Sequence, residues 1–292
     1  MKIQHCAPCK IGACEPQCGL KFTVEDNRII DIAPDPDHPI SKGYVCKKVM
    51  AIDEYQHDPD RLLFPEAKTP AGFKRSSWAT ATREIGTSLQ DIVDRWGPSS
   101  IATYWGNAAD SSGIILANSL CAAFGSPNSF NVLSLEYTDR GAVAGQMFGN
   151  EHLVLQPDAD NADFALLLGT NPLVTQGMTL LQRRPRIGES LKNIQRRGGK
   201  VVVVDPRLTE SAKIADQHVR IVPGTDLFLL LGMFNHITSQ RRYDVTYVGR
   251  CTSGLDKLTE IGSRFSNSDI SNITRIPEQI IKQLAEDLAA AD

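Results

Sequence analysis

The chain has 292 residues, a hydrophobic fraction of 41% and a formal net charge of −3. This length allows one large or two ordinary domains with a sizeable core. The acidic balance and the lack of long basic runs argue against a nucleic-acid-binding protein. No apolar stretch of about 18 residues is present, so we expect no membrane-spanning helix. The first ten residues show no apolar signal core and no twin-arginine pair, so we expect a cytoplasmic protein.

The cysteines gather near the start of the chain. Four of the seven fall within HCAPCKIGACEPQC, residues 5–18, and Cys46 comes further on. Structural disulfides are rare in the cytosol, so this dense spacing indicates a metal site. Close thiolates plus one remote thiolate are typical of a four-iron cluster. Zinc, which also takes four thiolates, and unliganded thiols remain open as alternatives.

The first 62 residues are rich in cysteine and turn residues. KFTVEDNRIIDIAPD predicts two short antiparallel strands joined at Asp26-Asn27, because Asn tolerates the left-handed turn conformation. PDHPISKGYVC and DPDRLLFPEAKTPAG are predicted to be loops from their Pro and Gly content.

From Ser77 onward, predicted helices alternate with strands. Helical spacing runs from Ala81 to Trp96, with Ser77 as the cap, and further helices are predicted over 112–124 and 139–148. The predicted strands are SIATYWGN, SFNVLS, DFALLL, KVVVV and HVRIV. Continuous apolar strands alternating with helices are typical of a parallel sheet covered on both faces, so the fold class is α/β.

The last predicted helix has no strand after it. Its apolar positions are Ile276, Ile280, Ile281, Leu284 and Leu288. In an alternating α/β pattern such a helix leads into another strand, so we interpret the sequence as part of a larger fold.

One long segment resembles a known family. CGLKFTVEDNRIIDIAPDPDHPISKGYVCKK is similar to the iron–sulfur segment of the molybdopterin oxidoreductases, which include formate dehydrogenases, assimilatory nitrate reductases and dimethyl sulfoxide reductase. Members read Cys-Gly, an alternating strand, GDPDHP and Gly-x-x-Cys-x-Lys. Here Cys18-Gly19, residues 35–39 and residues 43–48 occupy those places, and HDPDRLLFP matches the next stretch of the family sequence. The resemblance implies a 4Fe-4S cluster.

The spacing departs from the family at the first ligand. The family run Cys-x2-Cys-x3-Cys, counted back from Cys18 through Cys14, would place that ligand at Ile11. It must therefore come from Cys9 through a longer loop or, less directly, from Cys6, which is otherwise a spare thiol. The predicted ligand set is Cys9, Cys14, Cys18 and Cys46.

Three residues outside this set need an interpretation. Lys48 corresponds to the family lysine that lies between cluster and pterin and is thought to help electrons pass; the alternative is a solvated surface lysine. Cys121 and Cys251 are interpreted as small packing residues.

Three loops come directly after apolar strands, in LLLGTNP, VVVVDPR and VPGTD. Ligands of open α/β sheets bind at the carboxyl ends of the strands. Gly169 and Gly224 let backbone amides approach a phosphate or a flat ring. Asp205 is placed like an acidic residue that binds ribose hydroxyls, and Asp226 can accept two N–H bonds from a guanine edge. A turn at Asp205 and a helix cap at Asp226 are the alternatives.

The same loops match the family motifs in order. The resemblance implies a Rossmann-like unit that binds molybdopterin guanine dinucleotide, with Asp205 on ribose and Asp226 on guanine. The predicted cofactor-binding residues are Gly169, Thr170, Asn171, Pro172, Asp205, Arg207, Thr209, Gly224, Thr225 and Asp226.

The family also suggests where molybdenum or tungsten is ligated. In many relatives a Cys, Sec, Ser or Asp comes after the NxFNV-like strand, but NSFNVLSLEYTDRG contains no cysteine. Ser134, Glu136 and Asp139 offer oxygen ligands, which suit a high-valent metal. Glu136 or Asp139 is the predicted ligand, and a helix cap is the alternative for Asp139.

The resemblance implies a domain plan and a function. It predicts an iron–sulfur domain at 1–62, a connecting part of a second α/β domain at 63–106, a Rossmann-like pterin-dinucleotide domain at 107–268 and a return helix of that second domain at 269–292.

We interpret the chain as the N-terminal portion of a molybdenum or tungsten oxidoreductase, without the family's barrel and second pterin site. It would act on a small-molecule substrate and use a redox partner protein or electron-transfer subunit. Formate, nitrate, arsenicals and sulfoxides remain open as substrates. The alternative is a noncatalytic iron–sulfur and pterin-binding subunit that relays electrons or scaffolds a complex.

Overall fold

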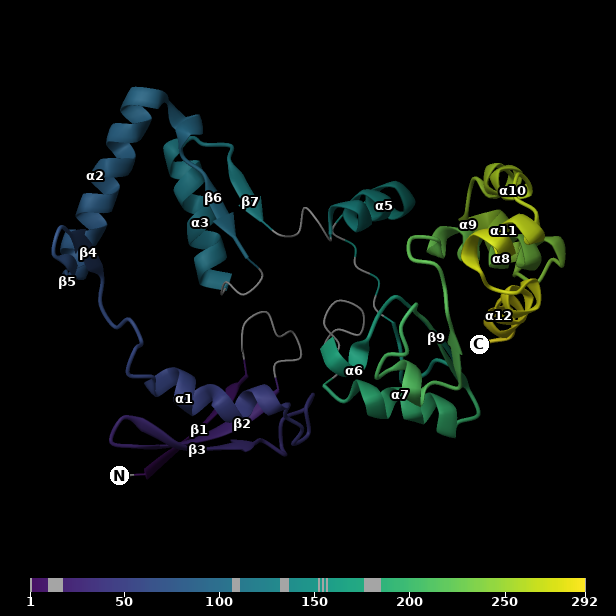
Figure 1. Cartoon of the computed structure of the whole chain (residues 1–292), viewed down its shortest axis with the longest axis horizontal. Helices are drawn as coiled ribbons and strands as arrows, with labels where there is room; N and C mark the ends of the chain where they lie inside the picture. Colours follow the sequence, from purple (N-terminus) through teal and green to yellow (C-terminus); the bar gives the residue numbers. More distant parts are fainter. Residues whose placement is uncertain are drawn as a thin grey trace. The chain divides into compact units, whose positions relative to one another are not determined.

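The computed structural model describes residues 2–9, 18–106, 111–131, 137–151, 153, 155, 157–175 and 185–291. It divides the chain into two compact units, Met1–Leu155 and Gln156–Asp292, whose elements are labelled in Figure 1. Within the described residues, no helix has the length and apolar character needed to cross a bilayer.

The first unit begins with an antiparallel sheet of three strands, β1 (Lys2–Pro8), β2 (Gly19–Glu25) and β3 (Arg28–Pro34), in that order. The predicted β2–β3 hairpin is confirmed, and Asp26 and Asn27 both have positive φ, at 48° and 61°. Two such residues give the backbone twist that a tight hairpin needs. β1 was not predicted. Its side chains are almost all exposed, so no hydrophobic alternation marks it as a strand.

Two short elements come after the sheet, the 3₁₀ helix η1 (Lys47–Ala51) and α1 (Ile52–His57). Next comes a hairpin of β4 (Glu66–Thr69) and β5 (Gly72–Arg75). The prediction of a loop through EAKTPAG is therefore wrong for residues 66–69 and for Gly72. Pro70 and Ala71 form the turn of the hairpin, and Gly72, the first residue of β5, takes a left-handed φ of 112°.

The rest of the first unit holds one long helix and a small α/β motif. α2 (Trp78–Trp96) begins at Ser77, whose Oγ accepts the Thr80 N–H at 3.1 Å, which confirms the predicted cap. After η2 (Pro98–Ser100), strands β6 (Thr103–Trp105) and β7 (Ser129–Asn131) pair in parallel around α3 (Ser111–Phe124), and α5 (Thr138–Phe148) comes next.

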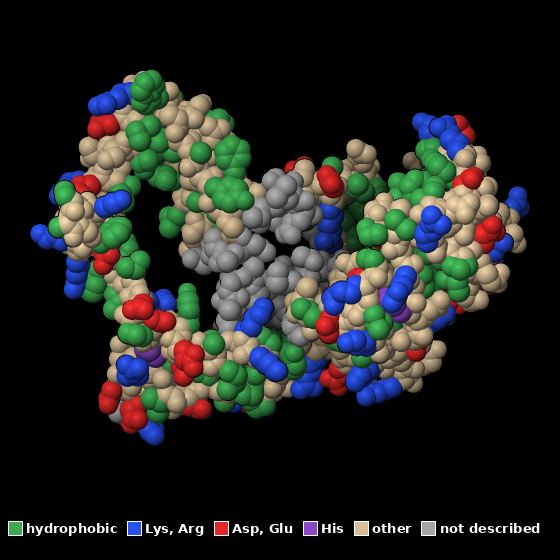
Figure 2. All heavy atoms as spheres, viewed as in Figure 1, with side chains coloured by type: hydrophobic (Ala, Val, Ile, Leu, Met, Phe, Trp, Pro, Cys, Tyr) green, Lys and Arg blue, Asp and Glu red, His purple; other side chains and the backbone are tan. Residues whose placement is uncertain are grey.

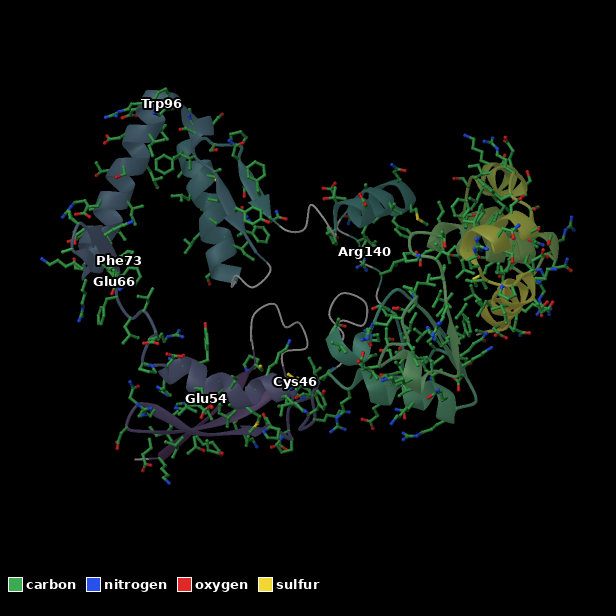
Figure 3. The ribbon with its side chains drawn as sticks, in the orientation of Figure 1. Cys46, Glu54, Glu66, Phe73, Trp96 and Arg140 are labelled. Carbon is green, nitrogen blue, oxygen red and sulfur yellow. The ribbon has the colours of Figure 1, made fainter. Side chains whose placement is uncertain are left out.

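The apolar face of α2 is largely exposed in this structure. α2 has no buried residue, and Trp96 at its end is 76% exposed (Figure 3). Figure 2 shows hydrophobic side chains at the surface over this part of the chain.

The second unit is built on a parallel sheet in the order β10-β9-β8, from β8 (Phe164–Leu168), β9 (Lys200–Val204) and β10 (Gln217–Val219). Val201 and Val203 pack with α7 (Ile187–Arg196), while Val202 and Val204 pack with α8 (Asp226–Ser239). All four valines are fully buried, and each such side chain contributes about 1.5–3 kcal/mol. Helices therefore cover both faces of the sheet, which confirms the predicted fold class.

The remaining elements of this unit are mostly helical. They are α6 (Pro172–Thr175), η3 (Ala212–Ile214), α9 (Val245–Cys251), α10 (Leu255–Ser263), α11 (Asn267–Thr274) and α12 (Glu278–Ala290). Helix α12 lies in the segment predicted to return to a second domain. Here Ile281 and Leu284 are buried in the core that α8 and α11 share.

Candidate functional site

Cys9 and Cys18 lie side by side at one end of the first sheet. Pro8 pairs with Gly19 in the β1–β2 register, and the next residue, Cys9, donates its N–H to the Cys18 carbonyl at 2.6 Å. Both side chains are buried, and they pack with Leu20 and Val49. Cys6 instead sits exposed on β1, so the geometry favours Cys9 over Cys6 as a cluster ligand.

Cys46 is connected to the buried cluster of Cys9 and Cys18 by Val49, which belongs to that cluster. It is partly buried directly before η1 (Figure 3), and its carbonyl accepts the N–H of Val49 at 3.2 Å. The fourth predicted ligand, Cys14, lies outside the described residues. Across the part that is described, no three metal-ligating side chains converge on one point. The four-ligand set therefore stays a prediction, and Lys48 is an exposed residue of η1.

The residue after Cys18 is fixed by a serine and a histidine. The N–H of Gly19 donates to Ser41 Oγ at 3.0 Å. The Ser41 N–H lies 3.2 Å from His38 Nδ1 and the Ser41 Oγ lies 3.1 Å from it. Because Nδ1 accepts the amide, it carries no proton, and the hydroxyl donates to it as well. A Cβ on Gly19 would collide with His38, so only glycine fits here.

The acidic turn at residues 35–37 is held to the same strand. Asp35 donates its N–H to the Gly19 carbonyl at 2.9 Å. Lys21 Nζ lies 3.2 Å from Asp37 and 3.3 Å from Asp35. These carboxylates, Asp37 first, raise the pKa of Lys21 above its usual value, so Lys21 is charged at neutral pH. The turn and Ser41 both bond to Gly19, the residue that comes directly after Cys18.

We expect Ser41→Ala to weaken the hold on the cysteine pair. Ser41 is fully buried, and its removal leaves the Gly19 N–H unsatisfied at a cost of about 1–3 kcal/mol. The protein should release iron to a chelator about tenfold faster than wild type, which corresponds to about 1.4 kcal/mol.

Ser126→Ala is the matched control for Ser41→Ala. Ser126 is also buried in the first unit, and its Oγ donates to the Ile101 carbonyl at 2.6 Å. Its loss should lower the melting temperature without speeding iron release. Equal iron release from the two variants would show that Ser41 contributes only general stability.

The second unit brings the three predicted loops to one edge of its sheet. They come after β8, β9 and β10, which are parallel neighbours, so their carboxyl ends share that edge. Gly169 has a φ of 57° and donates its N–H to the Val204 carbonyl at 2.9 Å. Gly224 has a φ of 79° just before α8. Both glycines take left-handed conformations that a side chain would strain.

Several predicted cofactor residues make contacts within the protein. Thr209 is 1% exposed, and its Oγ1 accepts the Ala212 N–H at 3.0 Å. Asp205 Oδ1 accepts the Arg207 N–H at 2.8 Å, and Thr225 Oγ1 donates to the Val222 carbonyl at 2.7 Å. Pro172 is buried at the start of α6. These side chains shape the loops, and Thr209 and Pro172 are closed to a ligand.

Asp226 is different from these residues. It is the first residue of α8, whose N-cap is Thr225, and no side chain caps the helix. Its carboxylate has no hydrogen-bond or ion-pair partner within the described part of the chain. The structure therefore does not support the helix-cap alternative, and it leaves a half-buried carboxylate at the edge where the loops meet.

The predicted metal ligands fall near α5. Asp139 is exposed in the first turn of that helix, whose N-cap is Tyr137, and no side-chain cap forms. Asp139 is therefore not a capping residue here. Glu136 and the other oxygen candidate, Ser134, lie outside the described residues.

Sequence reasoning missed the supporting residues. His38 stood inside the quoted family segment, but nothing in that segment showed that its ring accepts bonds from Ser41. Glu210 and Ser211 stood between two predicted cofactor residues. They contact Asn171 across 39 and 40 positions of the chain, which no local pattern shows.

Known families and proteins match this chain along most of its length. The "Molybdopterin oxidoreductase Fe4S4 domain" family model matches residues 6–58, and the "Molybdopterin oxidoreductase" model matches residues 61–275. Among solved structures, acetylene hydratase from Pelobacter acetylenicus matches with a TM-score of 0.81 at 23% identity, covering 96% of this chain and 38% of that one. This likeness shows the fold alone.

Curated relatives agree with the family models. The F420-dependent formate dehydrogenase subunit alpha of Methanocaldococcus jannaschii is 28% identical over 96% of this chain and 39% of the relative. The thiosulfate reductase molybdopterin-containing subunit of Salmonella typhimurium is 27% identical over 95% and 35%. Formate dehydrogenase H of Escherichia coli is 24% identical over 95% and 39%. The chain thus spans less than half the length of these relatives.

The matched regions coincide with the two sites. The first model covers Cys9, Cys18 and Cys46, and the second covers the three loops of the parallel sheet. The cofactors that these models name are a 4Fe-4S cluster and a molybdopterin. The chain belongs to the molybdopterin oxidoreductase family and carries its Fe4S4 domain.

Proposed function

We propose that this chain is the N-terminal part of a molybdenum or tungsten oxidoreductase that binds a 4Fe-4S cluster and molybdopterin guanine dinucleotide. Electrons would pass between the metal site and the cluster. The observation that carries the proposal is the buried Cys9–Cys18 pair, joined by a 2.6 Å backbone hydrogen bond, with Cys46 tied to the same core through Val49.

The cysteines suit a cluster in both chemistry and environment. Four thiolates complete such a cluster, which takes up and releases single electrons when bound. Cys9 and Cys18 are shielded from water. The hydrogen bonds among Gly19, Ser41 and His38 fix the backbone directly after Cys18. Cys9, Cys14, Cys18 and Cys46 are the proposed ligands. Lys48 would place a positive charge beside the cluster on η1.

The parallel sheet offers the nucleotide site. Backbone amides near Gly169 and Gly224 can approach phosphate, and the exposed Arg207 supplies a cation beside them. The carboxylate of Asp226 would bind the guanine edge, and Asp205 would bind the ribose. Thr170 and the backbone of Thr225 would line this site, and Glu136 or Asp139 would supply the oxygen ligand of the metal.

Substrate and partner come from the relatives only as proposals. The names of the relatives include formate and thiosulfate, so we propose a small-molecule substrate to be sought among these anions first. The formate relative is named as a subunit, which supports a separate redox partner or electron-transfer subunit. The reduced thiols that a cluster needs fit the cytosol as the compartment.

Elemental and nucleotide analysis of anaerobically purified protein tests the proposal. We expect about four irons and four sulfides per chain, with a brown colour that dithionite bleaches. Molybdenum or tungsten together with guanine nucleotide supports the enzyme. Iron without either metal supports a noncatalytic electron-transfer or scaffold subunit, and stoichiometric zinc without iron would contradict both.

A further inference from the structure

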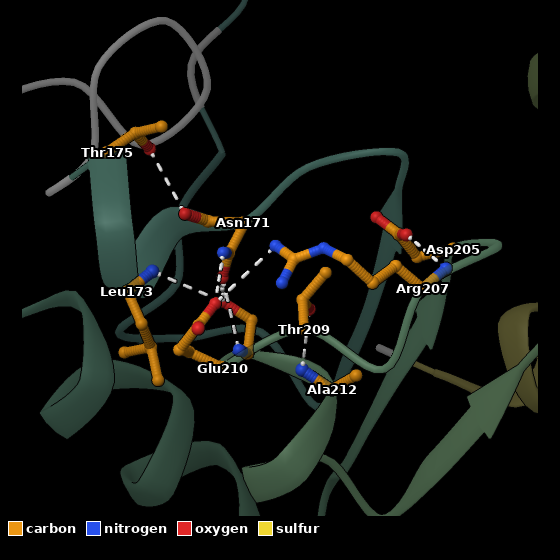
Figure 4. A network of polar contacts seen from close by, with 9 residues as sticks. Asn171, Leu173, Thr175, Asp205, Arg207, Thr209, Glu210 and Ala212 are labelled. Atoms are coloured by element: carbon orange, nitrogen blue, oxygen red, sulfur yellow. Dashed lines mark hydrogen bonds and ion pairs between the residues drawn. The ribbon is translucent and has the colours of Figure 1, made fainter.

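The loops after β8 and β9 are joined by side-chain hydrogen bonds around one asparagine. The Asn171 amide oxygen accepts the Ser211 N–H at 3.1 Å and the Ser211 hydroxyl at 2.7 Å. Its amide nitrogen donates to Glu210 Oε2 at 2.7 Å (Figure 4). Ser211 Oγ also accepts the Leu173 N–H at 3.2 Å. Every one of these bonds crosses from one loop to the other.

The position of Ser211 makes this junction resistant to water. Ser211 is fully buried, so its hydroxyl and amide must find partners within the protein. Asn171 supplies both partners with a single oxygen. That oxygen is therefore engaged inside the protein and is not available to bind a cofactor.

Glu210 connects the junction to a charge at the ligand edge. Its carboxylate lies 3.6 Å from the Arg207 guanidinium, which is 63% exposed. The Asn171 hydrogen bond is the largest influence that lowers the pKa of Glu210 below its usual value, so Glu210 is ionised at neutral pH. An exposed ion pair of this kind contributes little stability, but it orients the arginine.

We infer that Asn171 and Glu210 are positioning residues of the dinucleotide site. The Asn171–Glu210 hydrogen bond locks the two loops in register, and Glu210 holds Arg207 at the edge where phosphate would bind. This inference rests on the proposed function, because it assumes that a guanine dinucleotide occupies this edge.

Reversing the direction of the Asn171–Glu210 hydrogen bond in the full-length protein tests whether this bond holds the two loops together. Asn171→Asp keeps the oxygen that faces Ser211 but sets a second carboxylate against Glu210 at a 2.7 Å position. The two like charges should push the loops apart. Adding Glu210→Gln restores one donor and one acceptor with the direction reversed, so the double variant should recover.

Two readouts separate the lock from its effect on the cofactor. Hydrogen exchange at the Leu173 and Ser211 amides should speed up about tenfold in Asn171→Asp and return to within about threefold of wild type in the double variant. The half-life of bound guanine nucleotide in the holoenzyme should show the same order. Glu210→Gln alone should speed nucleotide release by about threefold, because its amide oxygen can still accept from Asn171 while the negative charge that pairs with Arg207 is lost.

Glu189→Gln is the matched control. Glu189 forms an i,i+3 pair with Arg186 at 3.2 Å, the same spacing as Arg207 and Glu210, but at the start of α7. It should alter neither readout.

The possible results distinguish the loop contact, the positioning role and the proposed function. Unchanged amide exchange in Asn171→Asp, or no recovery in the double variant, overturns the lock. Faster exchange with normal nucleotide release overturns the positioning role and leaves a purely structural contact. If wild-type protein holds no guanine nucleotide while the exchange pattern is as expected, the proposed function and the positioning role fail, and the loop contact stands.

Discussion

Serine in place of Cys18 or Cys46 is expected to remove most of the iron from the protein. A hydroxyl is a poorer ligand for a cluster than a thiolate, and the thiol buried beside Cys18 is that of Cys9, which is itself a proposed ligand. We expect iron per chain to fall to about a quarter or less of the wild-type value, together with the colour that dithionite bleaches.

Cys121→Ser is the matched control for this loss. Cys121 is also buried, at 2% exposure, but it lies on α3 and contacts the Thr103 hydroxyl at 3.2 Å. It should keep its iron, although burying a hydroxyl there costs some stability. Iron loss from Cys121→Ser as large as from Cys18→Ser would show that the assay reports unfolding instead of ligation.

The first ligand can be assigned in the same series. Cys9→Ser should lose iron and Cys6→Ser should keep it, because Cys9 is buried next to Cys18 while Cys6 is exposed on β1. The reverse pattern would show that the chain between Cys9 and Cys18 supplies the ligand differently. Equal tolerance of both changes would mean that either thiol can serve.

Hydrophobic patterns predicted the second unit well and the first unit less completely. Val201 to Val204 are buried in alternation against α7 and α8, so a continuous apolar run was enough to identify a parallel strand covered on both faces. β1 has no buried side chain, and β4 is mostly exposed. Strands that bury so little carry no periodic signal, and they form because a neighbouring strand offers hydrogen bonds.

The candidate sites show the same division. Motif order placed Asp205, Arg207 and Asp226 at one sheet edge, and the structure brings those loops to that edge. The motif did not separate residues that shape the loops from residues that are available to a ligand. Thr209 and Asn171 proved to be engaged within the protein, because their partners, Ala212 and Ser211, come close only after the loops have folded. Contacts of this kind depend on the tertiary structure and leave no local pattern.

Asp226→Ala is expected to weaken guanine-dinucleotide retention more than Asp205→Ala does. A carboxylate that accepts two bonds from guanine in a desolvated pocket specifies the base, and its loss leaves two donors unpaired at about 1–3 kcal/mol each. A ribose contact is more exposed, and water can replace it at smaller cost. The Asp205 change also removes the acceptor of the Arg207 N–H, so its measured effect includes a loosened turn and overstates the ribose contact.

Asp256→Ala controls for the position of Asp226 on its helix. Asp256 is an exposed acidic residue in the first turn of α10, in the same unit, and the favourable interaction of such a residue with the helix dipole is about 0.3–1 kcal/mol. Any effect of Asp226→Ala beyond that of Asp256→Ala therefore reports the nucleotide and not the helix.

The measurement is the guanine nucleotide released on denaturing full-length protein from a host that makes the cofactor. We expect at least about tenfold less from Asp226→Ala than from Asp256→Ala. Wild-type amounts in Asp226→Ala would show that its carboxylate does not bind guanine, even though it has no partner within the described chain.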